Sequence, residues 1–115
     1  MESVIRSVDA VTFEIMSHRL YQIAKEMGTT LERVGATVNT TQQHDYMASL
    51  YRANGDVLSA GESGGWHVAC AGFAVKRIIE RFEKDGGIHP DDMFLLNDPY
   101  LAAIQIGRAS CRERV

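Results

Sequence analysis

The stretch DAVTFEIMSHRLYQIAKEMGTTLERVG, residues 9–35, decides the fold because it predicts one long helix near the amino-terminal end of the chain. Its apolar residues recur at steps of three and four, the spacing of one face of an α-helix. They are Phe13, Met16, Leu20, Ile23, Met27, Leu31 and Val34. Asp9 is the expected N-cap, and Gly35 is expected to end the helix in the left-handed conformation. Such a helix would be ~36 Å long, more than a compact domain of this size needs, so we expect it to pack against something that this chain lacks.

A β-hairpin is predicted next, from two strand-like segments at 46–52 and 57–60. Asn54-Gly55 lies between them and supplies the positive φ angles that a tight hairpin turn requires. This dipeptide is the strongest local structural feature of the sequence.

A second helix is expected at about 68–84, after a glycine-rich loop at 61–65 and before Gly86-Gly87, which ends it. The apolar run MFLL at 93–96 is expected to be a buried strand. Helix, hairpin, helix and strand in this order predict an α+β fold, of which the chain holds a partial domain.

Composition and charge exclude several classes of protein. The chain is 45% hydrophobic and 23% charged, as in an ordinary soluble globular protein. Its formal net charge of −3 and scattered basic residues give no reason to expect nucleic acid or a membrane surface as a partner. No run approaches the ~18 apolar residues of a membrane span. Cys70 and Cys111 form no CxxC pair, so we expect neither disulfides nor a zinc site, and a cytoplasmic location.

The last ten residues, IGRASCRERV at 106–115, do not continue this design and have no helical or strand period. The segment resembles a translated short-read sequencing adapter, because the codons atc gga aga gcg tcg tgt agg gaa aga gtg would encode it residue for residue. We therefore expect residues 1–105 to be the genuine part of the chain and 106–115 to be an adapter-derived, non-native tail. An ordinary basic surface tail is the alternative.

Two segments that contain histidine are candidates for a functional site. His44-Asp45 precedes the hairpin, and a carboxylate beside an imidazole can orient it or share a metal. Because adjacent residues of a strand point to opposite faces, a polar loop exit is the favoured alternative. His67 follows the glycine-rich loop, where an anion or substrate could approach free amides and a titratable ring. A capping or packing histidine beside Trp66 is the favoured alternative.

A third candidate, Asp98, lies in Asn97-Asp98-Pro99-Tyr100, directly after the predicted strand. Functional groups are common at such loops, and a plain Asx-Pro turn is an equal alternative. Cys70 lies in an apolar helical stretch without a basic neighbour, so we expect an inert position in the core. The chain has no GxxxxGK[ST], GxGxxG or HExxH, so motifs predict neither nucleotide binding nor a zinc protease.

The chain begins with two short segments, DAVTFEI at 9–15 and SHRL at 17–20, that resemble the start of subunits of the hydantoinase B/oxoprolinase family. That family often has proline at the position of Ala10. The further matching segments follow in the family's order: HDY at 44–46, WH at 66–67, RF at 81–82 and DMFLLNDPY at 92–100. NDPY is the most specific of them. The resemblance spans essentially residues 9–104.

The resemblance implies part of an enzyme subunit. The family includes ATP-using hydrolases of 5-oxoproline and N-methylhydantoin, and the catalytic subunits of acetone and acetophenone carboxylases. Its members act with a hydantoinase A-like subunit or domain, and the full complex is expected to need ATP and a divalent metal. The family's metal-binding histidine and aspartate, three positions apart, come shortly after NDPY, and Gln105 stands where that histidine would be.

We therefore expect this fragment to hold neither metal nor ATP and to be inactive alone, since a metal site needs several ligands in fixed geometry. His67, Asp45 and Asp98 are expected only to line the site. Hydrolysis of a cyclic amide is the first hypothesis for the parent enzyme. A ketone carboxylase is the second, because Leu101-Ala102-Ala103-Ile104 looks nearer to that branch. The third is a non-catalytic interaction module that binds through the long helix.

Overall fold

The computed structural model describes residues 8–61, 65–101 and 110–113. In these ranges the elements are α1 (Ala10–Val34), α2 (Val38–Thr41), β1 (Ser49–Tyr51), β2 (Val57–Ala60), α3 (Gly65–Phe82), β3 (Met93–Leu96) and β4 (Ser110–Glu113). The predicted α+β order of helix, hairpin, helix and strand is confirmed. Predictions about residues 62–64, 102–104 and 105 lie outside the described residues.

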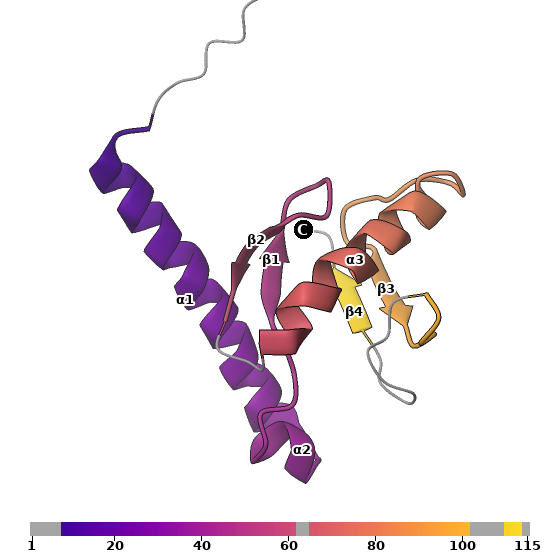
Figure 1. The fold of residues 1–115 in the computed structure, drawn as a ribbon, viewed down its shortest axis with the longest axis horizontal. Coiled ribbons are helices and arrows are strands. Elements are labelled where there is room, and N and C mark those ends of the chain that lie inside the picture. Colours follow the sequence, from indigo (N-terminus) through magenta and orange to yellow (C-terminus); the bar gives the residue numbers. More distant parts are fainter. Residues whose placement is uncertain (1–7, 62–64, 102–109, 114–115) are drawn as a thin grey trace, which may run out of the picture.

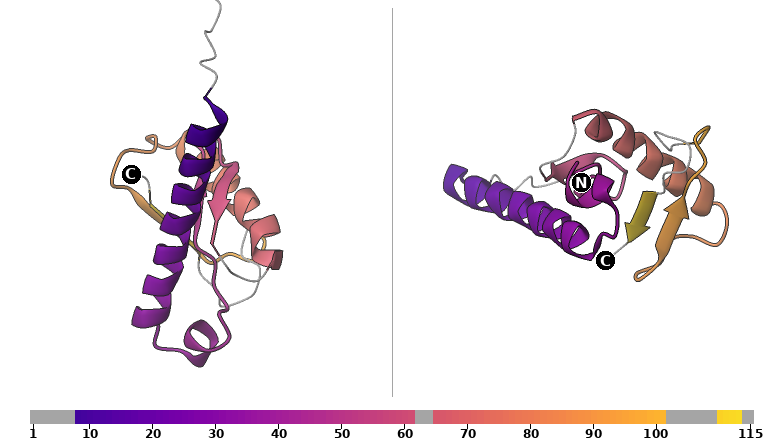
Figure 2. Two further views of the ribbon diagram at one scale, coloured as in Figure 1. Left: turned by 90° about the vertical axis from the view of Figure 1, so that its left-hand side faces the viewer. Right: turned by 90° about the horizontal axis from the view of Figure 1, so that it is seen from below.

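The elements lie side by side across the molecule (Figure 1). Helix α1 runs along one edge, the β1–β2 hairpin packs beside it, α3 lies on the far side of the hairpin, and β3–β4 lies beyond α3. The view from below in Figure 2 shows the same sequence of layers. The hairpin is therefore held between the two long helices.

Helix α1 begins as the sequence predicts and ends differently. The Asp9 carboxylate accepts hydrogen bonds from the Thr12 amide at 2.9 Å and from the Thr12 hydroxyl at 2.7 Å, and these bonds lower its pKa. Gly35 is not left-handed: its φ is −65° and ψ is 130°, and its amide donates to the Leu31 carbonyl. A Cβ at Gly35 would lie 2.8 Å from Thr40 Cγ2, so close packing of α2, which the sequence did not predict, favours glycine there.

The hairpin is antiparallel, as predicted, but its turn is longer than a two-residue turn. The Arg52 amide donates to the Asp56 carbonyl and the Gly55 amide to the Arg52 carbonyl, which closes a three-residue loop. Within this loop only Gly55 has a positive φ, at 85°, whereas the sequence analysis assigned one to Asn54 as well. The Asn54 side chain instead holds the loop, because its Oδ1 accepts from the Asp56 amide.

The closed side of α1 is made of small residues. Ala24 and Gly28 are its buried residues, with Ala24 beside Gly61 after β2 and Gly28 beside Tyr46 before β1. A Cβ at Gly61, at the end of β2, would lie 3.0 Å from the Ala24 carbonyl oxygen, and one at Gly28 would lie 3.1 Å from the Tyr46 ring. The helix and hairpin backbones therefore approach closely, which larger side chains would prevent.

Helix α3 packs on the other side of the hairpin turn. A Cβ at Gly55 would lie 2.7 Å from Lys76 Cγ, and Lys76 Nζ contacts the Asp56 carboxylate at 2.7 Å. Beyond the helix Gly86 and Gly87 both have positive φ, as expected of its end. None of the helices that the structure describes is both long and apolar enough to cross a bilayer.

Strand β3 is confirmed, but it is not buried. Met93 and Leu95 are 69% and 74% exposed, whereas Phe94 and Leu96 on the other face are partly covered. The Phe94 ring packs on the Phe82 ring of α3, with centroids 4.6 Å apart. A two-stranded sheet with a helix on one face leaves its other face open, which a run of four apolar residues does not reveal.

Residues 110–113, which lie in the segment without a helical or strand period, form β4 and pair with β3 from Met93↔Glu113 to Leu96↔Ser110. An exposed strand edge offers unpaired amides and carbonyls to any extended segment, so backbone pairing does not require an alternating side-chain pattern.

Candidate functional site

Two of the three predicted site residues meet. Asp45, between α2 and β1, and His67, in the first turns of α3, are 22 positions apart in sequence, and Asp45 Oδ1 lies 3.2 Å from His67 Nε2. His67 is only 4% exposed, and the Asp45 side chain is 28% exposed. Because an ionised carboxylate can only accept, this bond places a hydrogen on Nε2 and fixes the orientation of the ring.

The backbone at His44 explains how the pair is formed. His44 has a φ of 52°, in the left-handed region that few residues other than glycine adopt. The Asp45 amide next to it donates to the Asn39 carbonyl at 2.9 Å. His44 and Tyr46 then point to α1, whereas Asp45 between them points to α3. The expectation that adjacent side chains face opposite ways is confirmed, and each side chain has a partner.

Glu32 of α1 receives the other two side chains. Its Oε1 lies 2.6 Å from the Tyr46 hydroxyl and 2.5 Å from His44 Nδ1. The bond from Tyr46, and then the one from His44, holds the pKa of the Glu32 carboxyl below its ordinary value of 4.5. Glu32 was not predicted as a site residue, although it lies four positions after Gly28 and so on the same side of the helix.

Asp98, the third candidate, does not join this pair. Its carboxylate accepts from the Tyr100 amide at 2.9 Å and its carbonyl from the Leu101 amide at 3.2 Å, so the Asx-Pro turn is present. In Figure 1 the loop that follows β3 lies apart from the start of α3. The structure therefore places His67 and Asp45 in one cluster and Asp98 in another.

Cys70 is exposed, which corrects the expected position in the core. The buried side of α3 runs through His67, Ala74 and Ile78. Cys70 lies on the neighbouring side with Phe73, which is 52% exposed. On that side the Arg77 guanidinium lies 4.9 Å from the centre of the Phe73 ring, and the sequence pattern alone does not distinguish the two sides.

The described residues do not fit a metal ion by themselves. Across the described ranges, no group of three or more His, Cys, Asp or Glu side chains is close enough to hold one. His67 and Asp45 supply two potential metal ligands, which are already hydrogen-bonded to each other. A protein metal site needs more ligands in a fixed geometry, so the described residues alone do not form one.

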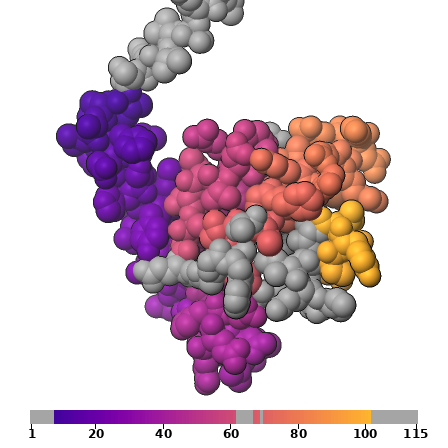
Figure 3. Space-filling view, viewed as in Figure 1, coloured from indigo at the N-terminus to yellow at the C-terminus, as the bar shows by residue number. Residues whose placement is uncertain are grey.

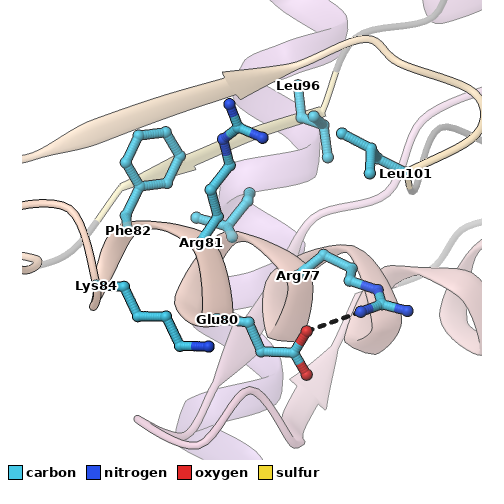
Figure 4. Close-up of a pocket in the computed structure, with 8 residues that line it drawn as sticks. Arg77, Glu80, Arg81, Phe82, Lys84, Leu96 and Leu101 are labelled. Carbon is cyan, nitrogen blue, oxygen red and sulfur yellow. Dashed lines mark hydrogen bonds and ion pairs between the residues drawn. The ribbon is translucent and has the colours of Figure 1, made fainter.

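A shallow depression of about 270 Å³ lies between the second half of α3 and the end of β3 (Figure 4). Phe82, Leu96 and Leu101 form its apolar part. Arg77 is bonded to Glu80 at 2.8 Å, whereas Arg81 and Lys84 form no ion pair within the described residues. Its exposed cations and open shape are those of an ordinary helix surface in solvent.

Comparison with known proteins identifies the family. The model of the family described as hydantoinase B/oxoprolinase matches residues 9–107, which is most of the chain. The chain belongs to the hydantoinase B/oxoprolinase family. This confirms the resemblance seen in the sequence.

Curated relatives are similar at low identity. An uncharacterized protein of Methanocaldococcus jannaschii is 26% identical over 100 residues, covering 86% of this chain and 18% of its own length. The 5-oxoprolinase of Saccharomyces cerevisiae is 24% identical over 92 residues, covering 80% of this chain and 7% of its own length. The acetone carboxylase alpha subunit of Xanthobacter autotrophicus is 26% identical over 101 residues, covering 87% of this chain and 13% of its own length. The chain thus spans between 7% and 18% of these relatives, and no solved structure matches it.

The His67–Asp45 pair lies within the matched segment.

Proposed function

We propose that the chain is the amino-terminal part of a longer hydantoinase B/oxoprolinase-type subunit whose full enzyme hydrolyses a cyclic amide of the 5-oxoproline or hydantoin class with ATP. The observation that carries this proposal is the family match over residues 9–107, combined with the small share of each relative that the chain spans. Residues 106–115 are, in this proposal, an adapter-derived tail that is not native.

The full enzyme is proposed to act with a hydantoinase A-like subunit or domain in the cytoplasm. ATP would activate a carbonyl oxygen of the substrate, and a divalent metal would be held by ligands outside the described residues. Since the described residues offer no set of three ligands, the chain alone is proposed to be inactive.

In the parent enzyme we assign His67 to the wall of the active site and Asp45 to a positioning role. The part-buried carboxylate–imidazole pair is the arrangement that fixes a histidine for proton transfer, because the carboxylate sets which ring nitrogen carries the hydrogen. Asp98 is proposed to line the same site from the NDPY turn. This requires the rest of the subunit to complete the site between the two clusters.

The alternative within the family is an ATP-dependent carboxylase of acetone or acetophenone type. It is supported by the similarity to the acetone carboxylase alpha subunit, which covers 87% of this chain. A non-catalytic interaction module is the alternative of another class, and the exposed apolar face of α1 is the feature that favours it.

The test is to express the parent subunit together with its hydantoinase A-like partner and to measure ADP release. We expect ADP release that depends on 5-oxoproline or a hydantoin. Release that depends only on acetone or acetophenone with bicarbonate would assign the carboxylase instead. A reading frame that ends after Val115, in a chain that releases no ADP with any partner, would leave the interaction module.

The assigned residues are tested in the same assay. His67→Gln is expected to lower kcat by on the order of 10²-fold, the ordinary contribution of one proton-transferring group. Asp45→Asn should lower kcat less and change the pH profile, because the amide can still bond the ring but no longer fixes its hydrogen. Gln22→Ala on the exposed polar side of α1 is the matched control and should leave activity unchanged. An unaltered pH profile in Asp45→Asn would remove the positioning role.

A further inference from the structure

The feature that the proposed function leaves unexplained is the outer side of α1. We call it the outer stripe, and it consists of Phe13, Met16, Ile23, Met27, Leu31 and Val34. Each of these side chains is between 40% and 73% exposed. The sequence predicts an apolar face at these positions, and within the chain the helix buries its small residues Ala24 and Gly28 instead.

The reason is the direction in which each set points. Ile23 and Met27 immediately precede the buried Ala24 and Gly28, so they point about 100° round the helix axis from the hairpin. Figure 2, left, shows α1 in front of the other described elements, and none of them crosses in front of the helix. In the space-filling view the first turns of α1 stand at the edge of the molecule (Figure 3).

The core formed by the described residues is small, which indicates that the exposed outer stripe belongs to a fold that these residues do not complete by themselves. Among the described residues, the buried apolar side chains are Ala24, Ala48, Ala74, Val75 and Ile78, and no large side chain is fully buried. Met93 and Leu95 of β3 are exposed as well. Contiguous apolar surface of this kind marks an interface, and here it occurs at both edges of the layered structure.

The spacing of the stripe points to the kind of element that covers it. Together with Leu20, its residues recur at steps of three and four over about three heptads, the pattern of a seam that packs against another helix. Arg19, Glu26 and Arg33 follow the outer flank of the seam at intervals of seven, and all three are exposed. A covering helix would match them with acidic, basic and acidic residues at the same interval.

We propose that the outer stripe is the docking site for an α-helix from the part of the parent subunit that follows Ile104, and not for another protein. This rests on the proposed origin of the chain in a longer subunit. The chain spans only 7% to 18% of its relatives, so most of such a polypeptide lies outside this structure and can supply the helix. The exposed outer face of β3, the last strand before Ile104, shows that burial is incomplete there too.

The test places a photo-crosslinking residue at Met27 of the full parent subunit, purified with its partner. We expect a crosslink within the same polypeptide, which leaves the mass on a denaturing gel unchanged and maps to a peptide beyond position 104. An adduct of doubled mass would show that a second copy covers the stripe, and an adduct with the partner subunit would show an intersubunit site. Either result, or no adduct, overturns the proposal.

The matched control carries the same residue at Gln22, which is exposed and lies about 140° round the helix from Met27. It is expected to form little or no adduct. The crosslink is read independently of catalysis. A parent subunit that crosslinks as expected but hydrolyses no cyclic amide would refute the proposed function and support the docking site. A subunit that hydrolyses a cyclic amide but forms no crosslink would support the proposed function and refute the docking site.

Discussion

The two sides of α1 differ in burial, because the inner side packs within the chain and the outer stripe is exposed. The inner side, with Ala24 and Gly28, closes on the hairpin so tightly that a Cβ at Gly61 would touch helix backbone. The outer stripe carries the larger apolar side chains and is exposed. Small residues thus determine which side of α1 packs within the chain. The large exposed apolar residues mark the side on which α1 can pack against a further element.

The largest expected effect comes from filling the closed side. Gly61→Val should lower the free energy of unfolding by up to about 3 kcal/mol, because the atoms that its Cβ would meet are backbone and cannot rotate away. Urea unfolding followed by circular dichroism measures this. Gly72→Ala in α3 is the control, since its new Cβ meets nothing closer than 3.6 Å. It should leave stability unchanged or raise it by about 0.5–1 kcal/mol. Equal losses in both variants would contradict the close approach.

The next effect concerns the buried pair. Asp45→Ala removes the carboxylate acceptor of His67 Nε2, and leaving a buried polar group without it should cost about 1–2 kcal/mol in the same unfolding experiment. Asp45→Asn keeps an acceptor oxygen and should cost less. If both variants unfold at the wild-type midpoint, the pair does not hold α3 to the segment before β1.

A smaller effect is expected in the pH dependence of stability. The pKa of Glu32 is lowered in the folded state, so between the folded and unfolded values the unfolded chain binds more protons. The stabilisation from Glu32 is therefore present above about pH 4.5 and is lost as the pH falls through the folded pKa. Thermal unfolding of Glu32→Gln from pH 7 to pH 3 should show a shallower loss in the acid range. A slope as steep as that of the wild type would exclude this contribution.

The smallest effect on stability is expected on the outer stripe. Ile23→Glu combined with Met27→Glu should change the unfolding free energy of the isolated chain by no more than about 0.5 kcal/mol, because both side chains are already exposed. The same double change should reduce aggregation of the isolated chain, which light scattering measures. A large loss of stability would mean that the stripe is part of this chain's own core.

Caps and turns were predictable from the sequence, whereas contacts between residues far apart in the sequence were not. Asp9, Gly86 and the Gly55 turn could be assigned because caps and turns depend on a few neighbouring residues. The contact between Asp45 and His67 could not, because it depends on the left-handed backbone at His44 and on how α3 packs. Periodicity found the apolar face of α1, but only the small residues beside it show which side the hairpin covers. For β3 and Cys70, apolar neighbours were mistaken for burial.

The most direct measurement of the central claim is to sequence the source DNA across the codon for Gln105 and well beyond it. We expect a histidine codon at this position, an aspartate codon three positions later and a long open frame whose translation continues the match to the hydantoinase B/oxoprolinase family. A frame that reads Gln105-Ile106-Gly107-Arg108 and stops after Val115 would contradict it, and would make the chain a small protein of this family with its outer stripe open to another partner.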